Sequence, residues 1–174
     1  MNKGYLIVLL GLALAGCGDY PGHRPGDALK MSQKANWGDV VGQAIALGGD
    51  CHIDSINDEP GEGRTSYTVK QSEPLKIVGW GAISAKDGVV TSDIAVALKD
   101  YSPLGVRLFA TTSKGKRPDV AAYFKNPTSV DSGFSALIDL SDVPTGNYVL
   151  EVIQHKDGKD LKCQYTANIT IVNS

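Results

Sequence analysis

The sequence has little of what marks several protein classes. Its 174 residues include only three cysteines and three histidines, and aromatic residues make up 7%. Seventeen basic residues nearly balance nineteen acidic ones, and they form no block that could track the phosphates of a nucleic acid. The GxSxG, HExxH and phosphate-loop motifs of common enzymes are absent. We therefore expect no nucleic-acid partner, no cofactor and no metal.

Long hydrophobic runs are also missing, but a short one lies at the start. Lys3 gives this start a positive charge, and a mostly apolar run then extends from Tyr5 to Leu14. The run is shorter than the roughly 20 residues that cross a bilayer. A charged start followed by a short apolar run is typical of a secretory signal peptide. We predict that residues 1–16 are such a signal peptide.

Leu14-Ala15-Gly16-Cys17 follows directly and closely resembles the lipobox of bacterial lipoproteins. The resemblance implies that Cys17 is acylated and becomes the mature N-terminus, and several acyl chains on one cysteine make a stable membrane anchor. Gly18, rather than an aspartate, follows the cysteine, which by the same resemblance favours the outer membrane. The alternative is an ordinary signal peptide with an unrelated cysteine beside it.

Two segments are expected between this anchor and the main domain. Residues 17–27 are rich in glycine and proline and show no hydrophobic period, so we predict a flexible tether. In residues 28–48 the apolar side chains fall at helical spacings, after Asp27 as a candidate N-cap. There we expect one or two short helices, packed on the domain or, alternatively, binding a partner.

From residue 49 to 174 the hydrophobic period becomes alternating. It is clearest from Leu161 to Ile171, where every second residue is apolar, as in a long strand with one buried face. Turn clusters separate the apolar stretches, and Asp157-Gly158 predicts a hairpin. We expect about eight short strands in an antiparallel β-sandwich, at 51–56, 64–70, 74–83, 93–99, 105–112, 134–139, 148–153 and 161–171.

Cys51 and Cys163 remain once Cys17 carries lipid. In an exported protein two thiols are expected to pair, and the bridge would tie the start of the domain to its end. The alternative is a metal site formed by both cysteines and His52, which offers only three ligand-type residues.

Four short motifs in the predicted domain resemble a bacterial immunoglobulin-like β-sandwich module of envelope and secreted proteins. They are Gly79-Trp80-Gly81, Arg117-Pro118-Asp119-Val120, Gly133-Phe134 and Pro144-x-Gly146-x-Tyr148. The first departs from the more usual glycine-tryptophan-alanine. The resemblance implies an immunoglobulin-like fold of about 7–8 strands, but no particular activity accompanies the module.

The motif around Arg117 has two interpretations. Pro118 and Asp119 suit the first turn of a short helix that crosses between the sheets, with Arg117 paired to Asp119. Alternatively, Arg117, Tyr123 and Phe124 form an exposed ligand surface. Trp80 has the same two options, core residue or sugar-stacking platform, and we expect it in the core.

Two further groups of residues have a structural and a functional interpretation. We expect a solvated turn, rather than a calcium site, from the acidic residues Asp54, Asn57, Asp58, Glu59 and Glu62. In Pro144-x-Gly146-x-Tyr148 the tyrosine hydroxyl is expected to bond back to the backbone.

Together these features predict an outer-membrane lipoprotein with a non-catalytic binding or scaffolding domain. Its partners would be the membrane, through the lipid, and an envelope component or envelope protein; the sequence gives no oligomeric state. A second hypothesis is an inhibitor or immunity-type lipoprotein that blocks an envelope enzyme with a protruding loop. A third is a hydrolase, which would need a pocket with two convergent carboxylates.

Overall fold

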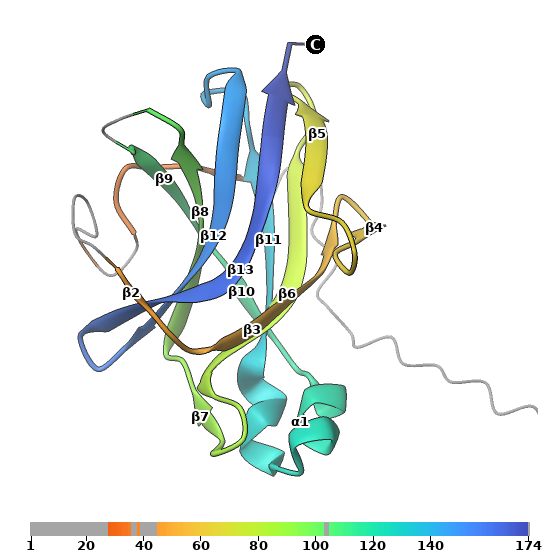
Figure 1. Cartoon of the computed structure of the whole chain (residues 1–174), viewed down its shortest axis with the longest axis vertical. Coiled ribbons are helices and arrows are strands. Elements are labelled where there is room, and N and C mark those ends of the chain that lie inside the picture. The colour runs from red at the N-terminus through yellow and green to blue at the C-terminus, as the bar shows by residue number, and fades with distance from the viewer. Residues whose placement is uncertain (1–27, 36–37, 39–44, 103–104, 174) are drawn as a thin grey trace, which may run out of the picture.

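The computed structural model describes residues 28–35, 38, 45–102 and 105–173 (Figure 1). Residues 1–27, which contain the predicted signal peptide, Cys17 and the tether, lie outside this part. The strands are β1 (Leu29–Lys30), β2 (Ala46–Leu47), β3 (Asp50–Ile56), β4 (Glu59–Pro60), β5 (Ser66–Lys70), β6 (Leu75–Ser84), β7 (Val89–Val90), β8 (Asp93–Asp100), β9 (Arg107–Thr111), β10 (Ser113–Gly115), β11 (Gly133–Asp139), β12 (Gly146–Lys156) and β13 (Lys159–Val172). An α-helix, α1 (Pro118–Phe124), and a 3₁₀ helix, η2 (Pro127–Ser132), connect β10 to β11.

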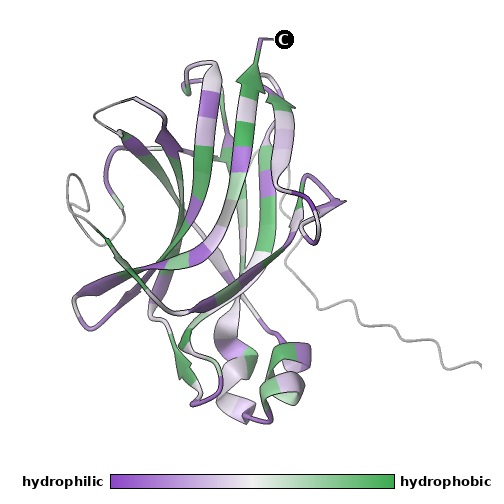
Figure 2. Cartoon of the chain, viewed as in Figure 1, coloured by the Kyte–Doolittle hydropathy of each residue, from purple (hydrophilic) through white to green (hydrophobic). Residues whose placement is uncertain are grey.

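The strands form two sheets packed face to face. Sheet A has the order β1-β11-β6-β3-β4, with β10 beside β11 and β7 beside β6. Sheet B has the order β2-β13-β12-β8-β9, with β5 beside β13. Hydrophobic and hydrophilic residues alternate along β13 (Figure 2), because one face of this strand meets the core. The largest fully buried side chains are Phe134, Ile53, Ile56, Leu75, Ile77, Leu98, Ile138, Leu140, Leu150, Ile153, Ile169 and Ile171.

The predicted all-β sandwich is confirmed. Each of the eight expected strands corresponds to a strand of five or more residues in the described chain, namely β3, β5, β6, β8, β9, β11, β12 and β13. The antiparallel expectation is wrong at three pairings, since β1 runs parallel to β11, and both β2 and β5 run parallel to β13. Alternation reports which face is buried, but it carries no information on strand direction.

The helical expectation for residues 28–48 is wrong for the residues that the structure describes there. Ala46 and Leu47 pair with β13, and Ser32 forms an isolated bridge with Phe109 of β9. Ala35 is buried against a second apolar cluster, on the outer face of sheet B, where Ala95 and Ala97 leave room for the chain. Strand edges offered hydrogen-bond partners to this glycine-containing segment, which has little helical propensity of its own. Residues 36–37 and 39–44 lie outside the described part.

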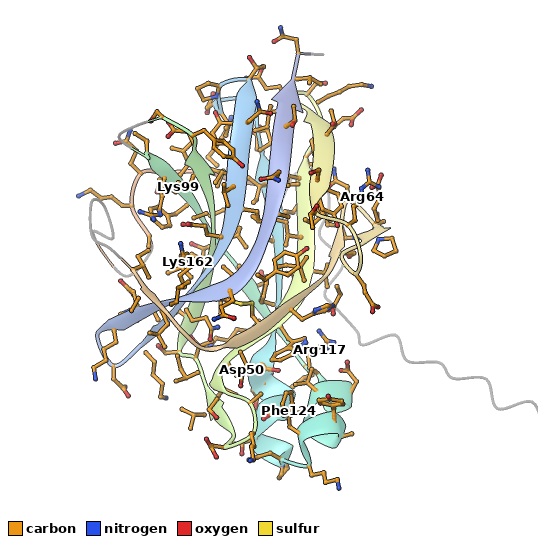
Figure 3. The ribbon with its side chains drawn as sticks, in the orientation of Figure 1. Asp50, Arg64, Lys99, Arg117, Phe124 and Lys162 are labelled. Atoms are coloured by element: carbon orange, nitrogen blue, oxygen red, sulfur yellow. A yellow bond between two sulfur atoms is a disulfide. The ribbon has the colours of Figure 1, made fainter. Side chains whose placement is uncertain are left out.

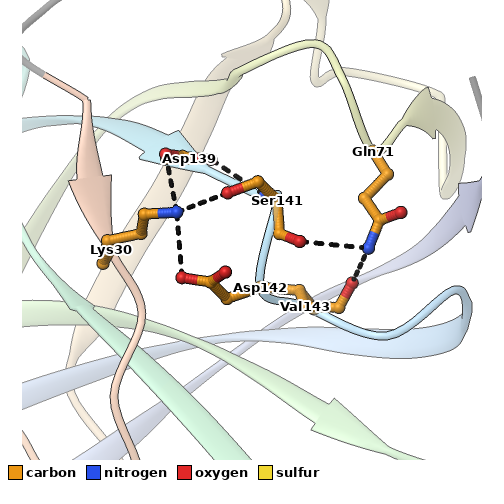
Figure 4. A network of polar contacts seen from close by, with 6 residues as sticks. All are labelled: Lys30, Gln71, Asp139, Ser141, Asp142 and Val143. Carbon is orange, nitrogen blue, oxygen red and sulfur yellow. Dashed lines mark hydrogen bonds and ion pairs between the residues drawn. The ribbon is translucent and has the colours of Figure 1, made fainter.

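A polar network fixes the start of the domain to the end of β11 (Figure 4). Lys30 Nζ lies 3.0 Å from Asp139 Oδ2 and 2.9 Å from Asp142 Oδ2, and it also donates to Ser141 Oγ. A hydrogen bond from the Ser141 backbone, together with Lys30, lowers the pKa of Asp139 to about 2. The chain therefore enters sheet A at the end of β11 that is far from α1.

Two predicted turns are present. Asp157 and Gly158 join β12 to β13 with φ of 51° and 73°, the left-handed values of a two-residue hairpin turn. The Tyr148 hydroxyl donates a hydrogen bond of 2.7 Å to the Pro144 carbonyl, which closes the turn between β11 and β12 as expected.

The predicted Cys51–Cys163 disulfide is present and joins the two sheets. Its Cα atoms lie 6.1 Å apart, with Cys51 on β3 of sheet A and Cys163 on β13 of sheet B. Between Thr166 and Lys162 the register shifts, so that three residues of β13 stand opposite one residue of β12. This bulge lies at Cys163, where β13 comes close to β3.

Candidate functional site

The helical segment between β10 and β11 carries the site that the sequence singled out. Pro118 occupies the first turn of α1 and Asp119 places a carboxylate there, as expected. The helix ends at Lys125, whose φ of 54° is left-handed. Contrary to expectation α1 does not cross between the sheets, because β10 and β11 are neighbours in sheet A. The chain changes sheet earlier, between β9 and β10.

Arg117 holds α1 to sheet A. Its guanidinium donates to Asp119 at 2.9 and 2.6 Å, as predicted, and also to Asp54 of β3 at 2.6 Å. The Arg117 hydrogen bond lowers the pKa of Asp119, whereas burial raises the pKa of Asp54 more than Arg117 lowers it. Only 11% of the Arg117 side chain is exposed. These contacts favour the structural interpretation of Arg117 over its role in a ligand surface.

Three aromatic side chains, Trp80, Tyr123 and Phe124, form what we call the aromatic face. The Phe124 ring packs edge-on against Trp80 with centroids 5.8 Å apart, and against Tyr123 with centroids 5.0 Å apart. Tyr123 is 81% exposed, and Phe124 is partly buried. Phe124 and Arg117 lie at the same end of the molecule (Figure 3). Of the predicted ligand surface, the two aromatic residues lie together and Tyr123 is open to solvent.

Trp80 is not in the core, contrary to expectation. It is half-buried on the outer face of β6, while Gly79 and Gly81 on either side are buried. A Cβ atom on Gly79 would lie 2.4 Å from the His52 carbonyl oxygen and 3.0 Å from the Phe134 ring, so only glycine fits there. The inward glycines thus place the intervening tryptophan outward, beneath Phe124.

The 3₁₀ helix η2 fixes the aromatic face to the sandwich. The buried Ser129 hydroxyl donates to the Ala85 carbonyl at 2.6 Å, and Asn126 Nδ2 donates to the Lys86 carbonyl at 3.1 Å. Lys116 pairs with Asp131 across the same segment. Tyr123 is therefore presented by a braced segment, which lowers the entropy cost of binding through it.

Neither the metal alternative nor the calcium alternative finds support in the described geometry. The disulfide consumes both thiols of the Cys51, His52 and Cys163 set. In the acidic segment, Asp58 pairs with Lys76, Glu59 with Arg64 and Asp54 with Arg117. No group of three metal-ligating side chains occurs in the described ranges. Asp54, Asp58 and Glu59 thus act as partners of cationic side chains.

Two hollows on the described surface bear on the hydrolase hypothesis. One is lined by Leu29, Lys30, Ser32, Lys34, Ala35, Phe109 and Thr111. The other is lined by Tyr101, Asn147 and Asn168. A glycoside hydrolase of the usual kind needs two carboxylates at its cleft, and these lining residues include none.

No protein-family model matches the sequence, and no curated protein matches it. Among solved structures it is similar to the endo-beta-1,4-mannanase from Thermotoga petrophila, at 12% identity and a TM-score of 0.43. The similarity covers 76% of this chain and 21% of that one, so the chain spans about a fifth of the enzyme. Within the residues described above, no helix has the length and hydropathy of a membrane span.

Proposed function

We propose that this chain is a lipoprotein of the bacterial cell envelope, anchored to the outer membrane through Cys17. Its immunoglobulin-like sandwich is a non-catalytic module that binds another envelope component through the aromatic face. The observation that carries the proposal is the 81% exposure of Tyr123 on a helix held by Arg117 and η2. Large exposed aromatic side chains on a rigid support are typical of binding surfaces.

The position of the aromatic face suits such an anchor. Residue 28 enters the domain beside the end of β11, whereas α1 precedes the start of that strand. In Figure 1 the helices lie at one end of the sandwich. A tether of eleven residues spans at most about 40 Å, so lipid at Cys17 would hold the opposite end close to the membrane. The aromatic face would then point away from it.

Co-sedimentation with peptidoglycan sacculi tests the binding function. The protein is purified from membranes in mild detergent, where sacculi remain insoluble, and its bound fraction is measured against sacculus concentration. We expect saturable binding that Tyr123→Ala weakens about tenfold, a loss of about 1.4 kcal/mol.

Leu47→Ala provides the control, since Leu47 is 64% exposed but lies on β2, outside the aromatic face. It should bind like the wild type. Absence of saturable binding, or equal losses in both variants, would contradict the proposal.

Cell fractionation tests the anchor separately. With Cys17→Ser no thioether to lipid can form, so nearly all of the protein should move from the membrane fraction to the soluble fraction. Immunoblots of the two fractions measure the change, with the Cys51→Ala/Cys163→Ala variant as the control that stays in the membrane. Retention of Cys17→Ser in the membrane fraction would show that the anchor is not a lipid on Cys17.

A further inference from the structure

A second candidate site lies at the other end of the sandwich. Tyr101, Asn147 and Asn168 line a hollow of about 360 Å³, which we call the Tyr101 hollow. Asn147 is the second residue of β12, which begins just after the end of β11 that lies far from α1. The Tyr101 hollow and the aromatic face therefore occupy opposite ends of the molecule. Its volume falls in the lower range of sites for small ligands.

Strand register builds a polar floor for this hollow on the outer face of sheet B. Asn147 pairs with Thr170, which pairs in turn with Thr68 of β5. In the next row outward-facing Asn168 is flanked by Val149 of β12 and Ser66 of β5. The side chains of Thr170, Thr68 and Ser66 are small, so they extend little above the sheet. Tyr101, 63% exposed, is the large aromatic side chain at this place.

Local hydrogen bonds orient both amide side chains. The Tyr101 hydroxyl donates to Asn168 Oδ1 at 2.6 Å, and the Thr170 hydroxyl donates to Asn147 Oδ1 at 2.9 Å. Each amide oxygen thus already accepts a hydrogen bond, and both asparagine residues are exposed. Neither amino group donates to a described residue, and together they offer four N–H donors. Such an array suits a ligand rich in acceptor oxygens.

We propose that the Tyr101 hollow binds a sugar ring of a neutral glycan. The exposed face of Tyr101 can pack on the C–H face of a pyranose, and the two amino groups can donate to its hydroxyl or acetamido oxygens. The described lining side chains carry no charge, and a neutral glycan needs no counter-ion there. This site goes beyond the proposed function, because it uses different residues at the opposite end of the domain.

Side-chain amide NMR tests the site at its own atoms. The ¹⁵N-labelled full protein in detergent is titrated with the β-1,4-linked trimers of N-acetylglucosamine and of glucose. The Nδ2 signals of Asn147 and Asn168 should shift saturably with at least one trimer. Binding of the N-acetylglucosamine trimer alone assigns the site to acetamido glycans, whereas binding of both assigns it to the hydroxyl pattern that they share.

Three variants distinguish glycan binding in the Tyr101 hollow from a loss of binding that any exposed substitution would cause. Tyr101→Ala should weaken binding about tenfold, whereas Tyr101→Phe keeps the ring and should stay within about threefold of the wild type. Leu47→Ala removes a large side chain that is 64% exposed, close to the 63% of Tyr101, but that lies on β2 outside the hollow, and it should bind like the wild type. The proposal is overturned if the Asn147 and Asn168 signals do not move with either trimer up to about 10 mM. Equal losses in Tyr101→Ala and Leu47→Ala would overturn it as well.

Discussion

The Cys51→Ala/Cys163→Ala variant is expected to lose about 4–5 kcal/mol of unfolding free energy at most, because the bridge closes a loop across 112 positions of the sequence. The chain-entropy model gives this upper value, and strain or residual unfolded structure reduces it. For a domain of this size the midpoint of thermal unfolding should fall by on the order of 10 °C. Calorimetry of both proteins under oxidising conditions measures the difference.

The position of the bridge makes its loss more than an entropy effect. The disulfide joins β3 of sheet A to the bulge of β13 in sheet B. Without it, the two sheets are held together there by their packing and by the hydrogen bond of 3.2 Å from Gln154 Nε2 to the Asp50 carbonyl. Reduction of the wild type should reproduce the effect, and the variant itself should not respond to reductant. Equal thermal midpoints for the variant and the oxidised wild type would refute a stabilising role.

The strands could be predicted from the sequence because side-chain alternation is a local property. The clearest case is β13, whose inward residues Cys163, Ala167 and Ile169 are buried as the alternation predicted. The parallel pairing of β5 with β13 could not be predicted, since it depends on which sheet each strand joins. The helical expectation was wrong for the described residues of 28–48 for a related reason. Ala46, Leu47 and Ser32 pair with strands elsewhere in the chain.

Only part of the candidate site could be predicted from the sequence. Pro118 and Asp119 predicted α1, but the Arg117 partner Asp54 lies 63 positions away, and no local pattern connects the two. The outward direction of Trp80 did have a signal that was missed. Successive side chains of a strand point to opposite faces. The odd-numbered residues of β6 face the core, namely Leu75, Ile77, Gly79 and Gly81, so Trp80 lies on the other face with Lys76. The odd or even position of each residue in β6 therefore predicts the outward direction of Trp80, whereas its hydrophobicity does not.

A buried charge cluster on sheet B was also hidden from sequence reasoning. Glu151 lies on the outer face of β12 with only 3% of its side chain exposed, between Arg107 of β9 and Lys162 of β13. Arg107 Nε donates to Glu151 Oε2 at 2.7 Å, and Lys162 Nζ donates to Oε1 at 2.9 Å. Ala35 and Ile45 of the N-terminal segment pack into the apolar cluster on this face of the sheet. The alternation of side chains predicts that the outer face of sheet B is exposed to solvent, but the N-terminal segment covers part of it.

Glu151→Gln should destabilise the domain by about 2–4 kcal/mol, because it leaves two largely buried cations without their carboxylate. This lies below the full cost of breaking a buried pair, since the Arg107 and Lys162 side chains keep 15% and 22% of their exposure. Urea denaturation at pH 7 measures the change as a lower midpoint at constant slope. The triple variant Glu151→Leu/Arg107→Met/Lys162→Met removes all three charges and should recover most of the loss.

The pH dependence of this difference identifies its electrostatic origin. Burial acts to raise the pKa of Glu151, but the hydrogen bonds from Arg107 and Lys162 outweigh it and hold the pKa below its ordinary value of 4.5. A carboxyl with a lowered folded-state pKa stabilises the protein above its unfolded pKa, and it loses that effect as the pH falls through the folded value. The gap between the wild type and Glu151→Gln should thus be full at pH 7 and should shrink below pH 4.5. A gap that stays constant with pH, or a Glu151→Gln variant within about 0.5 kcal/mol of the wild type at pH 7, would mean that the cluster adds no electrostatic stability.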